Sequence, residues 1–576
     1  MTTIGIVQLL LFFALVLLAT RPMGAYMARV FAGERTLLHP ILRPIERRFY
    51  GLLRVNEQED MRWTTYAFAM LAFSVVGGLL TYALLRLQGY LPFNPQHYTG
   101  QHMTPALSFN TAMSFMTNTN WQSYSPKQTV SYFSNMVALA VHNWMSAATG
   151  IAVAVAIIRG FARHSTNGIG NFWVDMTRAT LYVLLPFCFV YAIFLVWQGV
   201  PQNFAPYSHA TTLEGAKQAI AQGPVASQEC IKMLGTNGGG FFNANSAHPY
   251  ENPTPLTNFI QVFSIFLIPA GLTYTFGKMV GNVKQGWAIF AAMTVLFAAG
   301  LGVCYWAESN GNPNITRLGV GAVSNGDGQP SGNMEGKETR FGISASALFA
   351  TVTTGASCGA VNSMHDSYTA IGGAVPMVNM MCDETIFGGV GAGLYGMLMY
   401  AVIAVFIAGL MVGRTPEYVG KKIEKFEVRM AIVAVLILFS MVAFFTAIAA
   451  NVAYNNVNNP GAHGFSEIIY AYASAVGNNG SAFAGINTNT PFYNTTMGIA
   501  MLVGRFLMIV PLLAMAGSLA RKKVVPASAG TLPTDSGTFV FLLAAIVLIV
   551  GALEYFPALA LGPVVDQLHM VAGRLF

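Results

Sequence analysis

Four short polar segments of the chain have the composition of backbone-lined cation sites. Each is rich in glycine, threonine, serine or asparagine and is bracketed by apolar residues. The segments read Phe115-Met-Thr-Asn-Thr-Asn-Trp-Gln122, Met233-Leu-Gly-Thr-Asn-Gly-Gly-Gly240, Thr353-Thr-Gly-Ala-Ser-Cys-Gly-Ala360 and Val476-Gly-Asn-Asn-Gly-Ser-Ala482. If Asn120, Gly238, Gly359 and Gly480 are equivalent, the segments are separated by 118, 121 and 121 residues. This common period predicts one shared role for all four.

The segments lack ionised side chains that would bind a divalent cation or an anion. Residues 113–125, 234–246, 351–363 and 477–490 contain no Asp, Glu, Lys or Arg. Glycine reaches positive φ and asparagine tolerates it, so backbone carbonyls can turn inward. A ring of neutral carbonyl oxygens replaces the hydration shell of a large monovalent cation. The alternative, four ordinary polar outer loops, does not explain the common period.

We therefore predict a cation filter to which each polar segment contributes. Its residues are Thr117, Asn118, Thr119, Asn120, Thr236, Asn237, Gly238, Gly239, Ser357, Cys358, Gly359, Gly477, Asn478, Asn479 and Gly480. Gln122, just past the first segment, either lines the outer mouth or is an ordinary polar loop residue. No catalytic residue is predicted, because the sequence shows no convergent acid, base or metal constellation.

The composition indicates that a membrane surrounds these segments. Only 9% of the 576 residues are charged, against about 25% in a typical soluble chain. The hydrophobic fraction is 54% and the mean hydropathy is +0.52. These values exclude an ordinary soluble enzyme and predict an all-α polytopic membrane protein.

Ten apolar runs have the length of a membrane span. They lie near residues 4–19, 63–87, 129–158, 179–199, 256–277, 286–306, 387–411, 430–452, 494–517 and 538–560. Loops rich in Lys and Arg stay in the cytoplasm. With both termini outside, 21 of the 30 basic residues fall on the cytoplasmic side, eight of them within 21–62. The first run is expected to be an uncleaved anchor, since its basic residues follow it.

The period of the polar segments divides the chain into four pseudosymmetric helix–pore loop–helix repeats. Internal repetition of this kind builds a central site in transporters. The expected boundaries are 1–62 for an anchor helix and linker, 63–178, 179–285, 286–429 and 430–523 for the repeats, and 524–576 for a C-terminal helix. The third repeat contains glycines, a proline and two carboxylates between residues 365 and 393, which predicts a broken helix that forms a gate or side portal.

Several charged residues lie in or beside apolar stretches of the sequence, where placing a charge in the membrane costs free energy. Arg505 falls within an apolar span, where an arginine costs about 2.5–3.5 kcal/mol, so it is either tied to backbone carbonyls or placed as a positive charge below the filter. Asp383 and Glu384 are candidates for attracting the cation or for pairing with Arg414 and Arg505. A surface pair at the cytoplasmic edge is the alternative for these two acids.

The motif Gly235-Thr-Asn-Gly-Gly-Gly-Phe-Phe-Asn-Ala-Asn-Ser-Ala-His-Pro249, together with the other three segments, resembles the potassium-binding subunit (KdpA) of the bacterial Kdp potassium-transporting ATPase. The resemblance covers essentially the whole chain and implies K⁺ as the bound ion and the fold of the potassium transporter superfamily. It also implies a multi-pass location in the inner membrane and three partners: the catalytic P-type ATPase chain KdpB, the further subunit KdpC, and a small KdpF peptide. The TVGYG sequence of tetrameric potassium channels is absent.

The source of energy is expected on another chain. No GxxxxGK[ST] motif occurs, and no cytoplasmic segment is long enough for a nucleotide-binding domain. The leading hypothesis is therefore a translocating pump subunit that binds K⁺, contacts membrane lipids and binds neither nucleotide nor nucleic acid. The alternative is a self-sufficient potassium channel or secondary transporter. His142, His248, His365 and His463 lack metal-ligand spacing and are expected to be interface residues.

Overall fold

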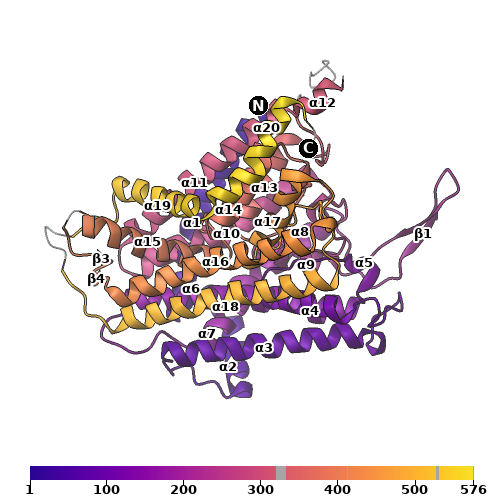
Figure 1. The fold of residues 1–576 in the computed structure, drawn as a ribbon. Coiled ribbons are helices and arrows are strands. Elements are labelled where there is room, and N and C mark those ends of the chain that lie inside the picture. Colours follow the sequence, from indigo (N-terminus) through magenta and orange to yellow (C-terminus); the bar gives the residue numbers. More distant parts are fainter. Residues whose placement is uncertain (319–331, 412, 527–530, 575–576) are drawn as a thin grey trace.

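The computed structural model describes residues 1–318, 332–411, 413–526 and 531–574 (Figure 1). Ten helices among them are long and apolar enough to cross a membrane, which confirms the predicted number of spans. They cover Thr3–Ala32, Trp63–Tyr90, Ser134–Ala162, Phe172–Trp197, Pro255–Met279, Val283–Arg317, Ala392–Met411, Lys425–Val452, Pro491–Arg521 and Gly537–Ala572.

Some spans are single helices, and others are runs of helical pieces. The single helices are α1 (Thr3–Ala32), α10 (Pro255–Met279), α15 (Ala392–Met411), α16 (Lys425–Val452) and α18 (Pro491–Arg521). The composite spans are α3 (Trp63–Leu87) with η1 (Gln88–Tyr90), η2 (Ser134–Ala140) with α6 (Val141–Ala162), α7 (Phe172–Arg178) with η3 (Ala179–Leu184) and α8 (Leu185–Trp197), α11 (Val283–Asn310) with α12 (Pro313–Arg317), and α19 (Gly537–Leu559) with η7 (Ala560–Val564) and α20 (Val565–Ala572).

Shorter elements lie between the spans. Four short helices precede the polar segments: α4 (Pro105–Met116), α9 (Val225–Leu234), α13 (Gly342–Gly355) and α17 (Gly461–Gly477). The remaining helical elements are α2 (His39–Leu53), α5 (Pro126–Thr129), α14 (Ala370–Met381), η4 (Asn245–Ala247), η5 (His365–Ser367) and η6 (Tyr454–Asn456). Strands in the described residues form two antiparallel pairs, β1 (Ser208–Thr211) with β2 (Lys217–Ile220) and β3 (Glu417–Tyr418) with β4 (Lys421–Lys422). The β1–β2 hairpin projects from the helical body (Figure 1).

Close helix contacts depend on small residues, as is common in membranes, where packing rather than the hydrophobic effect joins helices. A Cβ added at Gly160 of α6 would lie 2.7 Å from Ala516 of α18. One added at Gly504 of α18 would overlap the carbonyl oxygen of Val476, at the end of α17. The helix α18 therefore approaches both the third span and the fourth polar segment at backbone distance.

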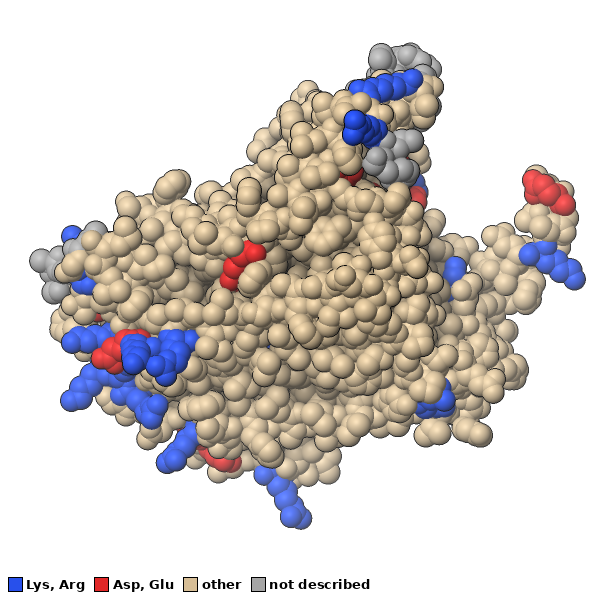
Figure 2. Space-filling view, viewed as in Figure 1, with Lys and Arg blue, Asp and Glu red and all other residues tan. Residues whose placement is uncertain are grey.

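Charged side chains are sparse over most of the face shown in Figure 2, although one acidic patch lies near its centre. Lys and Arg side chains gather at the end that carries β3 and β4, next to the start of α16 and the end of α18. The basic residues there include Lys421, Lys422, Lys425, Arg521, Lys522 and Lys523. The surface between this end and the opposite one is mostly uncharged, as expected for the part of a protein that faces lipid.

The first helix is longer than the predicted span of residues 4–19. It runs to Ala32, so that Arg21 and Arg29 lie on the helix rather than in a linker. The helix ends there because Gly33 has a φ of 75° and its N–H donates to carbonyls of the last helical turn. An arginine near a helix end is compatible with a membrane because its long side chain carries the charge toward water.

The third repeat contains the broken helix that the sequence predicts. The helix α14 ends at Met381, and α15 begins at Ala392. Between them the backbone takes positive φ at Asp383, Glu384 and Phe387. A non-helical stretch of this kind leaves backbone groups free, and it is buried within the protein, where such groups find partners.

Candidate ion-binding site

The four polar segments begin with the same backbone hydrogen bond. In each segment an N–H returns to the carbonyl five residues earlier, in the preceding short helix. The bonds are Thr119 to Ser114 (2.9 Å), Asn237 to Lys232 (2.9 Å), Cys358 to Thr353 (3.0 Å) and Asn479 to Ser474 (2.9 Å). These positions are separated by 118, 121 and 121 residues, the period read from the sequence. Each N–H is thus turned back toward its helix, which leaves the carbonyls of the segment available.

The segments also share a pattern of left-handed backbone conformations. Positive φ occurs one residue before and one residue after each of those N–H donors. The residues are Asn118 and Asn120 (67° and 54°), Thr236 and Gly238 (45° and 77°), Ser357 and Gly359 (49° and 80°), and Asn478 and Gly480 (62° and 88°). Alternation between positive and negative φ turns successive carbonyls toward the same side of the chain. The arrangement therefore presents rows of carbonyl oxygens, as a cation filter requires.

The segments contact one another in a closed ring. A Cβ added at Gly238 would overlap the carbonyl oxygen of Cys358, and one at Gly359 would overlap that of Asn479. One at Gly480 would overlap the carbonyl oxygen of Thr119, which returns the ring to the first segment. The first and second segments meet where Gly239 approaches the carbonyl of Asn120. Glycine is required at these contacts both for φ and for space.

Side chains tie neighbouring segments together. The Nδ2 of Asn118 donates to the carbonyl of Thr236 (2.9 Å), and the Oγ of Ser357 donates to the carbonyl of Asn478 (3.2 Å). The Nδ2 of Asn478 donates to the Oγ1 of Thr119 (3.0 Å). The Thr119 hydroxyl also contacts that of Thr117 at 2.8 Å. These amides and hydroxyls fix the ring without introducing charge, which suits a site that binds through neutral oxygens.

A cavity of about 830 Å³ lies next to the ring. Its walls include Asn120, Gln122, Gly239 and Gly480, so residues of three segments border it, and Val361 follows the remaining one. Gln122 accepts a hydrogen bond from the N–H of Gly240 (2.9 Å) through its Oε1. Of the two sequence interpretations of Gln122, the geometry favours a place at the mouth of the ring.

The loop that precedes α13 also borders this cavity, through Gly336, Lys337 and Glu338. Lys337 forms a buried ion pair of 2.6 Å with Glu308 at the end of α11, which holds this stretch in place. Residues 319–331 of the loop lie outside the described residues.

The break between α14 and α15 lies against the ring. The N–H of Val390 donates to the Oγ1 of Thr236 (2.9 Å), and the N–H of Gly388 donates to the carbonyl of Gly355 (3.0 Å). Glu384 is 3% exposed, and a Cβ at Gly477 would lie 3.1 Å from its Oε1. The broken segment therefore contacts the second, third and fourth segments together.

Glu384 is a buried acid without a fixed hydrogen bond. Within the described residues neither carboxylate oxygen makes a hydrogen bond, although the side chains of Ser357 and Asn479 lie close by. Arg505 is near enough to act on Glu384 electrostatically, but no ion pair joins them in the described residues. A buried carboxylate beside a neutral oxygen ring is a place where a cation would be stabilised.

The other predicted charges have different surroundings. Asp383 is buried and accepts a hydrogen bond of 2.6 Å from the hydroxyl of Tyr400. Both acids are buried, so the interpretation of Asp383 and Glu384 as a surface pair is wrong. Arg414 is exposed and contacts the carbonyl of Thr531, so it pairs with neither acid.

A buried charge cluster behind the second segment was not predicted. The Nζ of Lys232 lies 2.7 Å from carboxylate oxygens of both Glu229 and Glu251. The other oxygen of Glu251 accepts the N–H of Phe242 (2.8 Å), just after the segment. The cluster thus links α9, which leads into the segment, to the chain that leaves it. The sequence signal for it was Glu229 and Lys232, three residues apart in apolar surroundings.

Lys232→Met is expected to lower the free energy of unfolding by about 3–5 kcal/mol, because it leaves two buried carboxylates without their cation. Chemical or thermal unfolding of the purified protein measures the change. The triple variant Lys232→Met, Glu229→Gln, Glu251→Gln should recover part of the loss. Lys217→Met on the exposed β2 strand is the control and should change stability by less than about 0.5 kcal/mol. Equal stability of Lys232→Met and Lys217→Met would contradict a stabilising role for the buried charge cluster.

The family model described as "Potassium-transporting ATPase A subunit" matches residues 10–568. The chain belongs to this family. Relatives named "Potassium-transporting ATPase potassium-binding subunit" include one from Solibacter usitatus, which is 61% identical over 578 residues. Another, from Mesorhizobium japonicum, is 59% identical over 578 residues. Both alignments cover 100% of each chain, and the family resemblance predicted from the four motifs is thereby confirmed.

A solved structure shows the same fold in a more distant protein. The potassium transporter TrkH from Vibrio parahaemolyticus superposes with a TM-score of 0.50 at 15% sequence identity. The match covers 89% of this chain and 98% of that one. At this identity the likeness concerns the fold alone, and it agrees with the predicted all-α polytopic architecture.

Proposed function

We propose that this chain binds K⁺ on the outer side of the membrane and passes it inward as the potassium-binding subunit of an ATP-driven import complex. The closed ring of four neutral segments with one repeated backbone conformation carries this proposal. Family membership supports it, because relatives of the same length are named potassium-binding subunits of a potassium-transporting ATPase.

In the proposed site, each segment contributes the residue whose N–H bonds to the preceding helix, together with the residues on either side of it. The ion binds among carbonyls at Thr119, Asn237, Cys358 and Asn479 and at the flanking positions of each segment. The absence of carboxylates from the ring favours a monovalent ion, because oxygen sites for divalent cations usually include carboxylates. A density map of the protein in K⁺ would measure the size of the ring and the number of ions in it. A second map in Na⁺ is the comparison.

The proposed path continues along the broken segment between α14 and α15. Glu384 supplies a negative charge at the base of the ring, where a partly dehydrated cation leaves the carbonyls. Arg505 lies on the same path as a fixed positive charge that opposes free passage to the cytoplasm. Asp383 supports this path by accepting the hydrogen bond from Tyr400. Arg414 lies just past the cytoplasmic end of α15.

The proposed assembly places ATP hydrolysis on a P-type ATPase subunit (KdpB), with KdpC and the small KdpF peptide as further partners. The protein is proposed to lie in the bacterial inner membrane with both termini in the periplasm. The gathering of basic residues at the end that carries β3 and β4 supports this orientation (Figure 2). The four-repeat boundaries given above are part of the same proposal.

Ion flux through liposomes separates the pump subunit from the alternative, a self-sufficient channel or secondary transporter. In the proposed function, the purified chain alone carries no steady K⁺ current, and ATP-driven uptake appears only with the ATPase subunits. A steady K⁺ flux through the chain alone, without ATP, would overturn this proposal and favour the alternative.

Gln122→Arg is expected to weaken K⁺ binding at least about fivefold at low salt. Two unit charges about 4 Å apart repel by about 1 kcal/mol even in bulk water. The loss should shrink as ionic strength rises, because the cavity admits screening ions. K⁺ titration of the purified protein measures this effect. Gln101→Arg, an exposed change in the loop before α4, is the control. An unchanged affinity at low salt would place Gln122 away from the ion path.

A further inference from the structure

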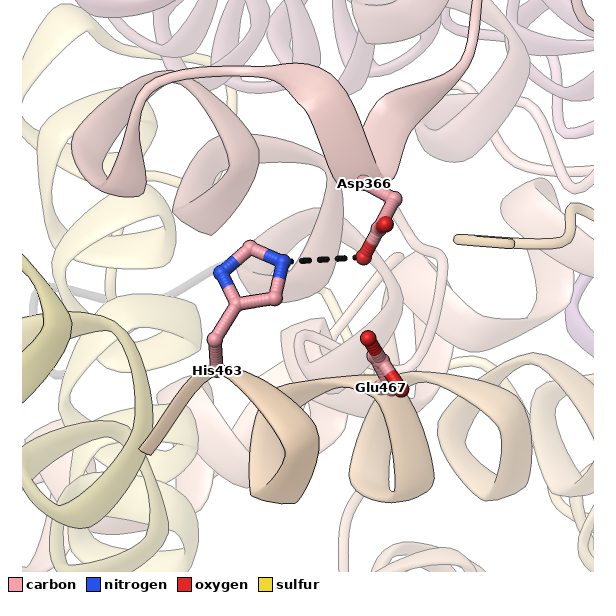
Figure 3. A group of neighbouring side chains, drawn as sticks. All are labelled: Asp366, His463 and Glu467. Atoms are coloured by element: carbon pink, nitrogen blue, oxygen red, sulfur yellow. Dashed lines mark hydrogen bonds and ion pairs between the residues drawn. The ribbon is translucent and has the colours of Figure 1, made fainter. Parts of the chain in front are cut away.

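A histidine and two carboxylates meet at the outer end of α17, away from the filter ring (Figure 3). His463 and Glu467 are four residues apart on α17 and therefore share one face of that helix. Asp366 belongs to η5, which follows the third polar segment. The Nε2 of His463 lies 2.9 Å from the Oδ1 of Asp366. One ligand atom from each of the three residues lies within 4.8 Å of the others.

These distances are close to those of a transition-metal site. Zinc–ligand bonds to histidine nitrogen and carboxylate oxygen are about 2.0–2.2 Å, and the usual geometry is tetrahedral. In that geometry two such ligand atoms are separated by roughly 3.3 Å. The gap between His463 and Asp366 therefore has to open by only a few tenths of an ångström to admit the ion. Glu467, which has a ligand atom within 4.8 Å of the other two, supplies the third ligand.

The residues around the cluster orient its ligands. The Nδ1 of His463 lies 2.9 Å from the Oδ2 of Asp566 on α20, which leaves Nε2 for the ion. Carboxylate–histidine–metal arrangements of this kind are common around protein-bound zinc. The Nδ2 of Asn459 donates to Glu467 (2.7 Å), and the N–H of Asn458 donates to the other oxygen of the same carboxylate (3.1 Å).

An ion can reach this cluster from outside. A cavity of about 380 Å³ is lined by Asp366, His463 and Asp566, together with Asn459 and Arg574. The side chains of Asp366 and His463 are 12% and 18% exposed. The five cysteines of the chain are buried, so no thiol at the surface competes for a soft metal.

We propose that His463, Asp366 and Glu467 form a binding site for one divalent transition-metal ion of the zinc class, with water as the fourth ligand and Asp566 as the partner of the histidine. The imidazole ligand favours zinc over calcium or magnesium, which take oxygen ligands. Histidine spacing in the sequence gave no sign of this site, because Asp366 lies 97 residues before His463 along the chain.

The metal would join two of the polar segments at their outer ends. Asp366 follows the third segment, and α17 leads into the fourth. Gly485, just past the fourth segment, packs on the same carboxylates, since a Cβ there would lie 2.7 Å from Asp366. Occupancy of the site would thus restrain both segments from outside the ring, while the metal itself stays apart from the K⁺ positions.

A proton is the competing occupant of the site. Burial by itself lowers the pKa of His463, but hydrogen bonds to Asp366 and Asp566 raise it to about 10. Because an imidazole must release its proton to bind a metal, Zn²⁺ affinity should rise with pH, and the binding measurements belong at pH 8 rather than at a lower pH.

The test is Zn²⁺ titration of the purified complex at pH 8, combined with X-ray absorption at the zinc edge. We expect one saturable Zn²⁺ per chain, coordinated by one imidazole and otherwise by oxygen. Asp366→Asn and Glu467→Gln should each weaken binding at least about tenfold, and Asp566→Asn by about 10–100-fold. His248→Asn, at a histidine stacked on Phe242 near the outer mouth, is the matched control and should leave Zn²⁺ binding unchanged.

Three outcomes would overturn the metal site: no saturable Zn²⁺ binding to the wild-type complex, equal binding by the wild type and both carboxylate variants, or loss of binding in His248→Asn. The absorption spectrum of the wild type needs no variant to fold, and sulfur or several imidazoles in it would also reject the site. K⁺ affinity measured on the same samples distinguishes a failure of the metal site from a failure of the proposed K⁺ filter. Intact K⁺ binding without Zn²⁺ binding rejects only the metal site.

Discussion

Gly480→Ala is expected to lower the K⁺ affinity of the protein at least about tenfold, which corresponds to about 1.4 kcal/mol of binding free energy. The residue has a φ of 88°, and its added Cβ would overlap the carbonyl oxygen of Thr119. That oxygen belongs to the neighbouring segment of the proposed filter, so the methyl group displaces a ligand as well as straining its own backbone. Discrimination of K⁺ from Na⁺ should fall with the affinity. Titration with each ion measures both quantities.

Gly281→Ala separates backbone strain from the loss of a ligand. Gly281 also has a positive φ, 78°, but lies in the exposed turn between α10 and α11 with nothing within 4 Å of an added Cβ. The strain of a left-handed alanine, about 1–2 kcal/mol, is then the same in both variants. Ion affinity should be unchanged in Gly281→Ala. If Gly480→Ala binds K⁺ and rejects Na⁺ as well as Gly281→Ala does, the ring is not the ion site.

Glu384→Gln is expected to reduce ATP-driven K⁺ uptake by the reconstituted complex at least about tenfold, with a change in K⁺ affinity of less than about threefold. The carboxylate is buried against the ring and makes no hydrogen bond within the described residues. In the proposed path, a cation that leaves the carbonyls is the counter-ion of this acid. In such surroundings a unit charge at 4 Å contributes about 4 kcal/mol at an effective dielectric constant of 20. Uptake rates at saturating K⁺ measure the loss.

Two variants show whether charge rather than shape is responsible. Glu384→Asp keeps the negative charge with a shorter side chain and should retain more transport than Glu384→Gln. Glu214→Gln removes an acid from the exposed turn of the β1–β2 hairpin and should have no effect. Normal uptake by Glu384→Gln would exclude the proposed role of this carboxylate, whatever the other variants do.

The membrane spans were predictable because hydropathy is a local property of the chain. Ten apolar runs became ten helices, and the basic residues gather at one end of the molecule as their positions in the sequence suggest (Figure 2). Helix ends were less predictable, since α1 continues 13 residues beyond the predicted limit of residue 19, to Ala32. Its end depends on the conformation of Gly33 and on where Arg21 and Arg29 place their charges.

The polar segments were found from residue types, but their geometry was not. Glycine and asparagine at positions such as 120, 238, 359 and 480 indicate left-handed backbone. Thr236 and Ser357 also have positive φ, which their residue types do not favour. Tertiary hydrogen bonds hold them there, since Val390 donates to the Thr236 hydroxyl and the Ser357 hydroxyl donates to Asn478. Such conformations cost about 1–3 kcal/mol and persist only where the surroundings impose them.

By itself, the sequence of this protein determined a ten-helix membrane protein with four neutral polar segments at a common period, because composition and repetition can be read along the chain. Only the tertiary structure decided that these segments close into a ring, that Glu384 lies against it, that Lys232 is paired with two buried carboxylates, and that His463 meets Asp366. The physical reason is distance along the chain: Thr119 and Gly480 are 361 residues apart, and their contact depends on the packing of every helix between them.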